Sequence, residues 1–455
     1  MNRFGICGRA LPSLLLAVLL TATAAVAQER DMEERLRELE RQVELIRQQL
    51  EGQDSAAIAR LRMQIEAITR EIEELKLGQE VVVPADSGLY GLGPAASRVY
   101  RAGQGVSIGG YGELLYENFA SEREDGSTSG ATDQLDALRA VFYVGYKFGG
   151  DFLFNSEIEL EHASTGGDGS VSVEFAYIDW LFSEPLGARA GLLLVPMGLL
   201  NELHEPPIFL GSERPLTERA IIPSTWRENG VGLFGGAEGF SYRAYLVNGL
   251  DATGFSAAGL RGGRQKGSKA LAEDFAAVAR VDFEGILGLL VGSSVYLGNS
   301  GQGAVSPIDG STIDARTVIW EGHAQYRARG IWLRGLAALA DVSDVEEINQ
   351  AQGFTGNASV GERLIGWYLE GGYDLLRSVR TGQRLLPYVR YEQVNTQDRV
   401  PTGFSANPAN DQQIVTLGAA WFPIPNIVVK ADYQIRKNEA DTGVDQFNVN
   451  LGYMF

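Results

Sequence analysis

The chain is poor in cysteine and histidine, and both shortages narrow what it can be. Its single cysteine, Cys7, lies near the N-terminus, so the rest of the 455-residue chain can form neither a disulfide nor a thiolate metal site. The three histidines, His162, His204 and His323, are far apart, and no metal-ligand spacing joins them. The formal charge of −19 makes nucleic acid an unsuitable partner. We therefore expect no metal, no cofactor and no nucleic-acid partner.

Long apolar runs are also missing beyond the first residues. The run LPSLLLAVLL follows Arg3 and Arg9 and precedes the site Ala25-Val26-Ala27. This order is typical of a secretory signal peptide, so we predict that residues 1–27 are cleaved on export. A membrane anchor is the alternative, but the run is short for a spanning helix. No later stretch is long enough for a transmembrane helix.

Residues 28–78 show a helical heptad pattern. Its seam comprises Leu36, Leu39, Val43, Ile46 and Leu50 and then, after a slip in register, Ile58, Leu61, Ile65, Ile68, Ile72 and Leu75. Such a seam predicts a coiled coil, as a parallel bundle between subunits or a helical hairpin within one chain. Aliphatic residues at both seam positions favour a parallel trimer, and a solvated spacer helix is the remaining alternative. Residues 79–105 are predicted to form a Pro/Gly linker.

From residue 106 onward the period of hydrophobicity changes to two, which indicates β-strands. Sixteen strands are predicted, at 106–117, 135–148, 151–162, 171–183, 187–196, 230–236, 240–248, 274–282, 288–297, 316–327, 330–341, 362–375, 384–394, 412–422, 427–436 and 446–455. Tight connections such as FGGD and FPIPN alternate strictly with long polar ones. A meander with short turns at one end and long loops at the other is the layout of an outer-membrane barrel.

A bilayer requires such a sheet to close, because unpaired backbone groups are too costly in lipid. The terminal strand QFNVNLGYMF is therefore expected to pair with the strand at 106–117 and to turn its aromatic face to lipid. Aromatic residues near strand ends suit interfacial girdles, namely Tyr116, Trp180, Phe182, Trp320, Trp421 and Phe422. A soluble sandwich or propeller is the alternative, but neither requires signal-directed export or loops that are long on one side only. The predicted fold class is all-β: a transmembrane antiparallel up-and-down barrel over 106–455, preceded by the coiled coil.

The third long loop, at 197–229, differs from the others by mixing apolar side chains with both signs of charge. Ile208, Phe209 and Ile221 would have no reason to occur in a purely exposed loop. We therefore predict that it folds into the barrel, packs on the inner wall and narrows the channel. The alternative is an external loop that docks on a neighbouring subunit.

Charged residues of this loop and of inward strand positions are the candidate pore-lining set. From the loop they are Glu202, His204, Glu205, Glu213, Arg214, Glu218, Arg219 and Arg227, and from the strands Arg139, Arg243, Arg280, Arg334, Arg390 and Lys430. We expect Arg214, Arg219 and Arg227 to oppose Glu202, Glu205 and Glu213 near the constriction. The fourth long loop carries a basic cluster, Arg261, Arg264, Lys266 and Lys269, that either attracts anions at the mouth or is simply solvated.

The segments VSIGGYGELLY and VPMGLLNELHEPP…TWRENGVGLFG, with the C-terminal Phe455, resemble the phosphate-selective porin O and P family. The resemblance covers about residues 106–455 and centres on 195–235. It implies a sixteen-stranded trimeric pore with an inward third loop, and a terminal aromatic residue read by the barrel-assembly machinery. Residues 81–455 hold 28 Lys and Arg against 44 Asp and Glu. Because phosphate selection needs clustered cations with few competing carboxylates, the balance favours weak ion preference, with anions such as phosphate among the possible solutes.

The resulting prediction is an outer-membrane porin for passive diffusion of small hydrophilic solutes. Its expected setting is the outer membrane of a Gram-negative bacterium, as a homotrimer in lipid with the coiled coil in the periplasm. One rival is a structural tether that links the barrel to the cell wall through the coil. The other is a barrel enzyme, to which no sequence motif points.

Overall fold

The computed structural model describes residue 41 and residues 89–455, except 103, 150, 168, 184, 380 and 381. The expected signal peptide, nearly all of the expected coiled coil and the first part of the expected linker lie outside the described residues. No helix in the described part is long and apolar enough to cross a bilayer.

The described residues form sixteen strands, and their bounds follow the predicted ranges closely. They are β1 (Gly105–Phe119), β2 (Gln134–Lys147), β3 (Phe152–Glu161), β4 (Ser170–Ser183), β5 (Leu186–Leu194), β6 (Arg227–Ala237), β7 (Phe240–Asn248), β8 (Phe275–Ile286), β9 (Leu289–Gly298), β10 (Thr317–Ala328), β11 (Ile331–Val342), β12 (Arg363–Tyr373), β13 (Arg384–Arg399), β14 (Asp411–Ile424), β15 (Ile427–Asn438) and β16 (Gln446–Met454). The helices of the described residues are short: α3 (Arg98–Arg101) precedes β1, and α4 (Leu216–Ala220) and α5 (Val345–Gln352) lie in loops. The loops also contain the 3₁₀ turns η2 (Pro206–Ile208), η3 (Ala252–Gly254), η4 (Arg261–Gly263), η5 (Gly356–Ala358) and η6 (Pro408–Asn410).

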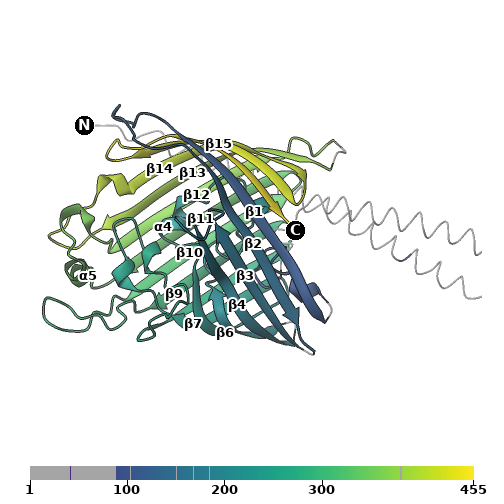
Figure 1. Ribbon diagram of the computed structural model, residues 1–455, viewed down its shortest axis with the longest axis horizontal. Helices are drawn as coiled ribbons and strands as arrows, with labels where there is room; N and C mark the ends of the chain where they lie inside the picture. Colours follow the sequence, from purple (N-terminus) through teal and green to yellow (C-terminus); the bar gives the residue numbers. More distant parts are fainter. Residues whose placement is uncertain are drawn as a thin grey trace, which may run out of the picture. The chain divides into compact units, whose positions relative to one another are not determined.

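Each strand pairs antiparallel with the next, and β16 pairs with β1, so the sheet is a closed barrel. The closing ladder runs from Tyr111 opposite Met454 to Phe119 opposite Gln446. The predicted sixteen strands and their closure are thus confirmed. In Figure 1 the loops that carry α5 lie at one end of the barrel and the C-terminus lies at the other.

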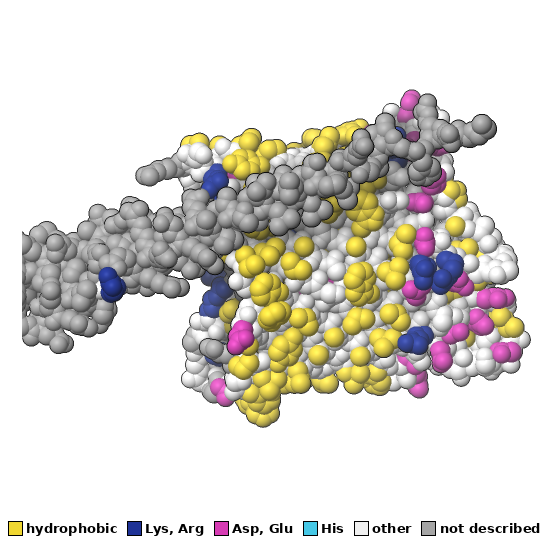
Figure 2. Space-filling model, turned by 180° about the vertical axis from the view of Figure 1, so that it is seen from behind, with side chains coloured by type: hydrophobic (Ala, Val, Ile, Leu, Met, Phe, Trp, Pro, Cys, Tyr) yellow, Lys and Arg dark blue, Asp and Glu magenta, His cyan; other side chains and the backbone are white. Residues whose placement is uncertain are grey.

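Alternation along the strands separates an apolar outer face from a polar inner face. In β15, Lys430 and Asp432 point to the inner face and are buried, whereas Tyr433 points to the outer face and is 42% exposed. Figure 2 shows hydrophobic side chains across the middle of the barrel wall, with charged side chains gathered towards its ends. A wall of this kind suits contact with hydrocarbon on the outside and water on the inside.

The expected aromatic girdles need one correction. Trp180, Phe182, Trp320 and Trp421 are all exposed on the outer face, but Phe422 is only 1% exposed. Successive residues of a strand point to opposite faces, so Phe422 must turn inward once its neighbour Trp421 faces outward. There it lies under the guanidinium of Arg384, 4.3 Å from the ring centroid.

The described end of the expected linker is packed against the barrel. Leu92, Ala95, Ala96, Val99 and Tyr100 are buried. Helix α3 contacts β1, β2 and β3, and the amide of Asn155 donates to the carbonyl of Ala96 over 2.9 Å. Residues 89–102, called the N-terminal segment below, therefore belong to the barrel interior.

Candidate functional site: the barrel interior

The third long loop, residues 195–226 between β5 and β6, is anchored to the inner wall by apolar contacts. Leu210 belongs to a buried cluster with wall residues from four strands, namely Trp332, Leu386, Tyr388, Ala420, Phe422 and Val428. Pro206 lies so close to β16 that a Cβ on Gly452 would meet the proline Cβ at 2.3 Å. Glycine at that position lets the loop backbone approach the wall.

Wall side chains on the far side of the barrel satisfy the loop's backbone groups. The carboxylate of Asp432 accepts from Ser212 N over 2.7 Å, and that of Glu392 accepts from Leu216 N over 2.7 Å. Lys430 donates from Nζ to the carbonyl of Gly211 over 2.9 Å. Because buried backbone groups need partners, these bonds fix the course of the loop through the interior.

At its start the loop is fastened by Asn201 and Glu218. The side chain of Asn201 accepts from Trp226 N over 2.6 Å and donates to the carbonyls of Val195 and Trp226 over 2.7 and 2.9 Å. Glu218 accepts from Leu200 N over 2.7 Å and from the hydroxyl of Tyr368 over 2.6 Å. Both ends of the loop are thereby held together.

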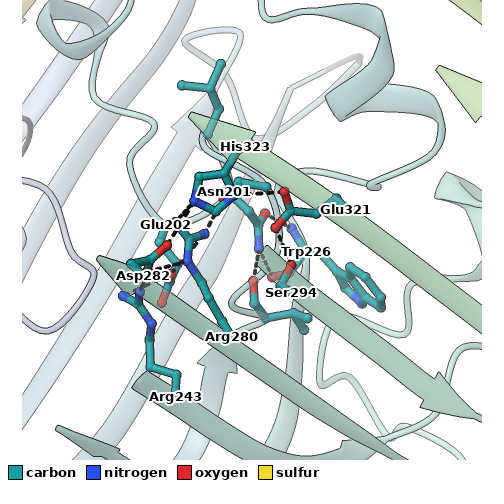
Figure 3. A network of polar contacts seen from close by, with 12 residues as sticks. Asn201, Glu202, Trp226, Arg243, Arg280, Asp282, Ser294, Glu321 and His323 are labelled. Carbon is teal, nitrogen blue, oxygen red and sulfur yellow. Dashed lines mark hydrogen bonds and ion pairs between the residues drawn. The ribbon is translucent and has the colours of Figure 1, made fainter. Parts of the chain in front are cut away.

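A charged network connects the loop to the wall formed by β7 to β10. It contains Glu202, Arg243, Arg280, Asp282, Ser294, Glu321 and His323, seen from close by in Figure 3. Glu202 of the loop pairs with Arg243 over 3.3 Å. Arg243 and Arg280 both pair with Asp282. His323 places its two ring nitrogens 2.8 Å from Asp282 and 2.8 Å from Glu321. Since an unpaired buried charge is very costly, the network fixes this part of the loop.

His204 of the loop is also buried, and it meets the wall at β3. Its Nδ1 lies 2.8 Å from the carbonyl of Asn201 and its Nε2 lies 3.1 Å from Glu157 Oε1. Burial, reinforced by the positive charge of Arg214, lowers the pKa of His204 from 6.5 to about 3. The ring is therefore neutral at physiological pH.

The charged residues expected to oppose one another near the constriction have different partners in the structure. Arg219 pairs with Glu213 over 2.8 Å. Arg227 belongs to β6 and pairs with Glu174, whereas Glu205 accepts from the backbone of Ala95 and Ala96 over 3.0 Å each. The partners of these groups come from the wall and the N-terminal segment, because the loop spreads over the interior instead of folding on itself.

The remaining candidate strand residues all face the interior, each with a partner there. Arg139 pairs with Glu113 and Glu159, Arg280 and Arg243 with Asp282, Arg334 with Gln325 and the carbonyl of Ile208, and Arg390 with Glu392 and Glu370. In this set Arg334 and Lys430 hold loop carbonyls rather than a carboxylate. Most of the interior charge is therefore neutralised in pairs.

Arg214 is the exception among the candidate loop arginines. Within the described part of the chain it forms no ion pair, and its Nη2 is buried without a hydrogen-bond partner. Burial, and then the positive charge of Arg139, lower the pKa of Arg214. The hydroxyl of Tyr111 nearby is also buried without a partner. Unsatisfied polar groups of the loop and of β1 are therefore found on the same side of the barrel interior.

Two interior residues that sequence reasoning did not single out, Asp179 and Arg189, bind the N-terminal segment. The hydroxyl of Tyr100 donates to Asp179 over 2.7 Å, and Arg189 donates to that hydroxyl over 2.8 Å and to Asp179 over 2.8 Å. Asp179 and Arg189 are single charges within the apolar runs YIDWLF and LGARAGLLL. A lone charge at an inward position was a usable signal, because it has to find a partner inside the barrel.

Among the described residues, no group of histidines, cysteines and carboxylates is placed to hold a metal ion. The interior offers instead a polar surface whose charges are mostly paired, with Arg214 as the exception named above. That arrangement suits selection of solutes by size and charge.

Several solved structures of outer-membrane channels resemble this barrel. OmpF of Salmonella typhi, in complex with daunomycin, has a TM-score of 0.51 at 14% identity and covers 78% of this chain and 99% of its own. The outer-membrane channel DcaP of Acinetobacter baumannii has a TM-score of 0.48 at 12% identity, over 77% of this chain and 97% of its own. The OmpF likeness shows that the two proteins share a barrel fold.

No protein-family model matches the chain, so the similarity to the phosphate-selective porins stays a resemblance. A curated protein of Aquifex aeolicus (strain VF5), described as an uncharacterized protein, is 38% identical over 392 residues. The match covers 84% of this chain and 87% of that protein. Identity of this extent over most of both chains places the two sequences together: the chain belongs to the same family as the Aquifex aeolicus protein.

Proposed function

We propose that the protein is an outer-membrane porin, a water-filled channel for the passive diffusion of small hydrophilic solutes. The observation that carries the proposal is the third long loop inside a closed barrel whose outer face is apolar. A loop anchored to opposite walls narrows the lumen without closing the sheet, as a size-selective channel requires.

The proposed constriction lies between Arg214 of the loop and the wall of β1 to β3. Arg139 pairs with both Glu113 and Glu159 there, whereas Arg214 forms no ion pair among the described residues. Two arginines and two glutamates balance in charge, which gives the channel only a weak ion preference. Small anions such as phosphate are then among the solutes that pass.

We further propose that the short turns and both chain ends face the periplasm, that the protein is a homotrimer, and that the strand ending at Phe455 is recognised by the barrel-assembly machinery. A periplasmic location of the coiled coil predicted at 28–78 belongs to the same proposal. A link from this coil to the cell wall is the rival function, and deletion of 29–80 separates the two. Loss of envelope attachment with unchanged conductance favours the tether as the role of the coil.

Reconstitution in planar bilayers tests the porin proposal. We expect stepwise conductance and a reversal potential in a salt gradient that indicates weak ion preference. Arg214→Ala should shift this potential towards cations, because the unpaired charge is removed. Arg123→Ala, which removes the same charge from an exposed loop, should leave it unchanged. A barrel that stays closed at all voltages contradicts the proposal, and an unchanged potential in Arg214→Ala places the constriction elsewhere.

A further inference from the structure

A pocket of about 600 Å³ lies between the fourth long loop and β4. Its charged lining comprises Arg227, Arg261, Arg264 and Lys266 with Glu161 and Glu174. This volume falls within the range of small-molecule sites. None of the contacts described so far accounts for it.

The pocket exists because β4 extends beyond its partner β5. The β4–β5 ladder ends at Ala176 opposite Leu192, whereas β4 begins at Ser170 and pairs there only with β3. The chain turns inward after Leu194 to form the third loop, which leaves residues 170–175 of β4 with one free edge. The fourth loop lies beside this edge, because Arg261, Arg264 and Lys266 line the pocket together with residues of β4.

Two cations of the fourth loop lack an ion-pair partner among the described residues. In the part of the chain that the structure describes, Arg261 and Lys266 form no ion pair, whereas Arg264 donates to the carbonyl of Thr225 over 2.7 Å. Arg261, Arg264 and Lys266 line the same pocket, so their positive charges lie close together. The crowding of positive charge means that a bound anion would relieve repulsion there.

The floor of the pocket offers the opposite kind of group. Glu174 is 2% exposed and pairs through Oε1 with Arg227, but its Oε2 is buried without a hydrogen-bond partner. The hydroxyl of Ser170 donates to Glu161 over 3.1 Å, so that serine is already engaged. A carboxylate oxygen only accepts, so the ligand has to bring a donor such as a hydroxyl.

We propose that this pocket binds acidic sugars, that is, polyhydroxylated solutes with one carboxylate. The ligand carboxylate would lie against Arg261 and Lys266, and a sugar hydroxyl would donate to Glu174 Oε2. A small inorganic anion satisfies only the first requirement and is repelled by Glu161 and Glu174. A neutral sugar satisfies only the second. The inference rests on the proposed porin function in that the pocket would concentrate these solutes at the channel mouth.

Binding to the detergent-purified full-length protein tests the inference by calorimetry with three probes. D-glucuronate carries both features, D-glucose only hydroxyls and acetate only charge. We expect glucuronate to bind about tenfold more tightly than either single-feature probe, since each charge-assisted hydrogen bond contributes about a factor of ten. Equal binding of acetate and glucuronate, or of glucose and glucuronate, overturns the proposal.

Variants locate the site. Arg261→Ala combined with Lys266→Ala should abolish the preference for glucuronate, whereas Lys269→Ala, in the same loop but outside the pocket lining, should retain it. Glu174→Gln should weaken glucuronate more than acetate. Heat-modifiable gel migration confirms folding, and if Glu174→Gln does not fold, the exposed loop variants still decide the question. Unchanged binding in the double variant overturns the proposal.

The two proposals fail in different ways. Binding of glucuronate without any conductance would support the proposed pocket and contradict the proposed porin function. Conductance without a preference for glucuronate would support the porin function and contradict the pocket.

Discussion

Single buried residues carry the balance of charge in this interior, and His204 shows how. The histidine is 2% exposed and neutral, with its pKa lowered by burial and by Arg214. In the unfolded chain the ring takes up a proton near 6.5, but in the folded chain only near 3. Between these values the unfolded state binds more protons, so acidification lowers stability by about 1.4 kcal/mol per pH unit.

His204→Asn should therefore reduce the loss of thermal stability in detergent between about pH 7 and about pH 5, because the group that titrates on unfolding is removed. His162→Asn is the matched control, since that histidine lies on the surface and pairs with Asp136 over 2.6 Å. Melting curves at several pH values give the measurement. An identical pH slope for His204→Asn and the unaltered protein would show that the imidazole is not neutral inside the barrel.

At the same scale, the sequence could predict which way a charge points but not which partner it meets. Alternation along a strand places Arg243 and Lys430 inside, as the structure has them. That Glu202 meets Arg243 and that Lys430 meets the carbonyl of Gly211 depends on the path of a 32-residue loop through three dimensions. Periodicity contains no information about that path, so the sequence could not show that Arg227 pairs with Glu174 of the wall.

At the scale of elements, strands were predictable and the N-terminal segment was not. Each strand repeats one local pattern, and the period of two survives even in the shortest, such as β7. Residues 89–102 contain glycine and proline without a periodic pattern, which indicates a linker. Their burial depends on contacts with Asn155, Asp179 and Glu205, which are remote in sequence.

Glu205 joins this segment to the third loop, and its removal should loosen the segment. The carboxylate accepts from Ala95 N and Ala96 N, so Glu205→Ala leaves two buried backbone donors without it. We expect amide exchange in residues 89–102 to accelerate by about tenfold or more, given the strength of hydrogen bonds to charged groups. Hydrogen-exchange mass spectrometry measures this, with Glu122→Ala in an exposed loop as control. Equal exchange in both variants would mean that wall contacts alone hold the segment.

At the scale of the whole molecule, barrel closure was predictable from physics together with loop lengths. The strict alternation of tight and long connections requires an up-and-down meander, and backbone pairing in lipid requires that its edges meet. The pairing of β16 with β1 follows from these two conditions. The pocket beside β4 could not be foreseen, because it results from unequal lengths of neighbouring strands on one side of an inward loop.

The outward apolar face is the feature on which the membrane assignment depends, and Leu369 of β12 tests it. This residue is 61% exposed and lies between Gly335 of β11 and Tyr391 of β13, near the middle of the strand. If the face contacts hydrocarbon, Leu369→Arg should destabilise the folded barrel by about 2–4 kcal/mol, as expected for a cation near the bilayer midplane. Ser127→Arg adds the same charge to an exposed loop and should cost almost nothing. Urea titrations of both variants in lipid vesicles, read by gel migration, give the two free energies of unfolding. Equal values for the two variants would mean that Leu369 faces water, and the outer wall would then have no reason to be apolar.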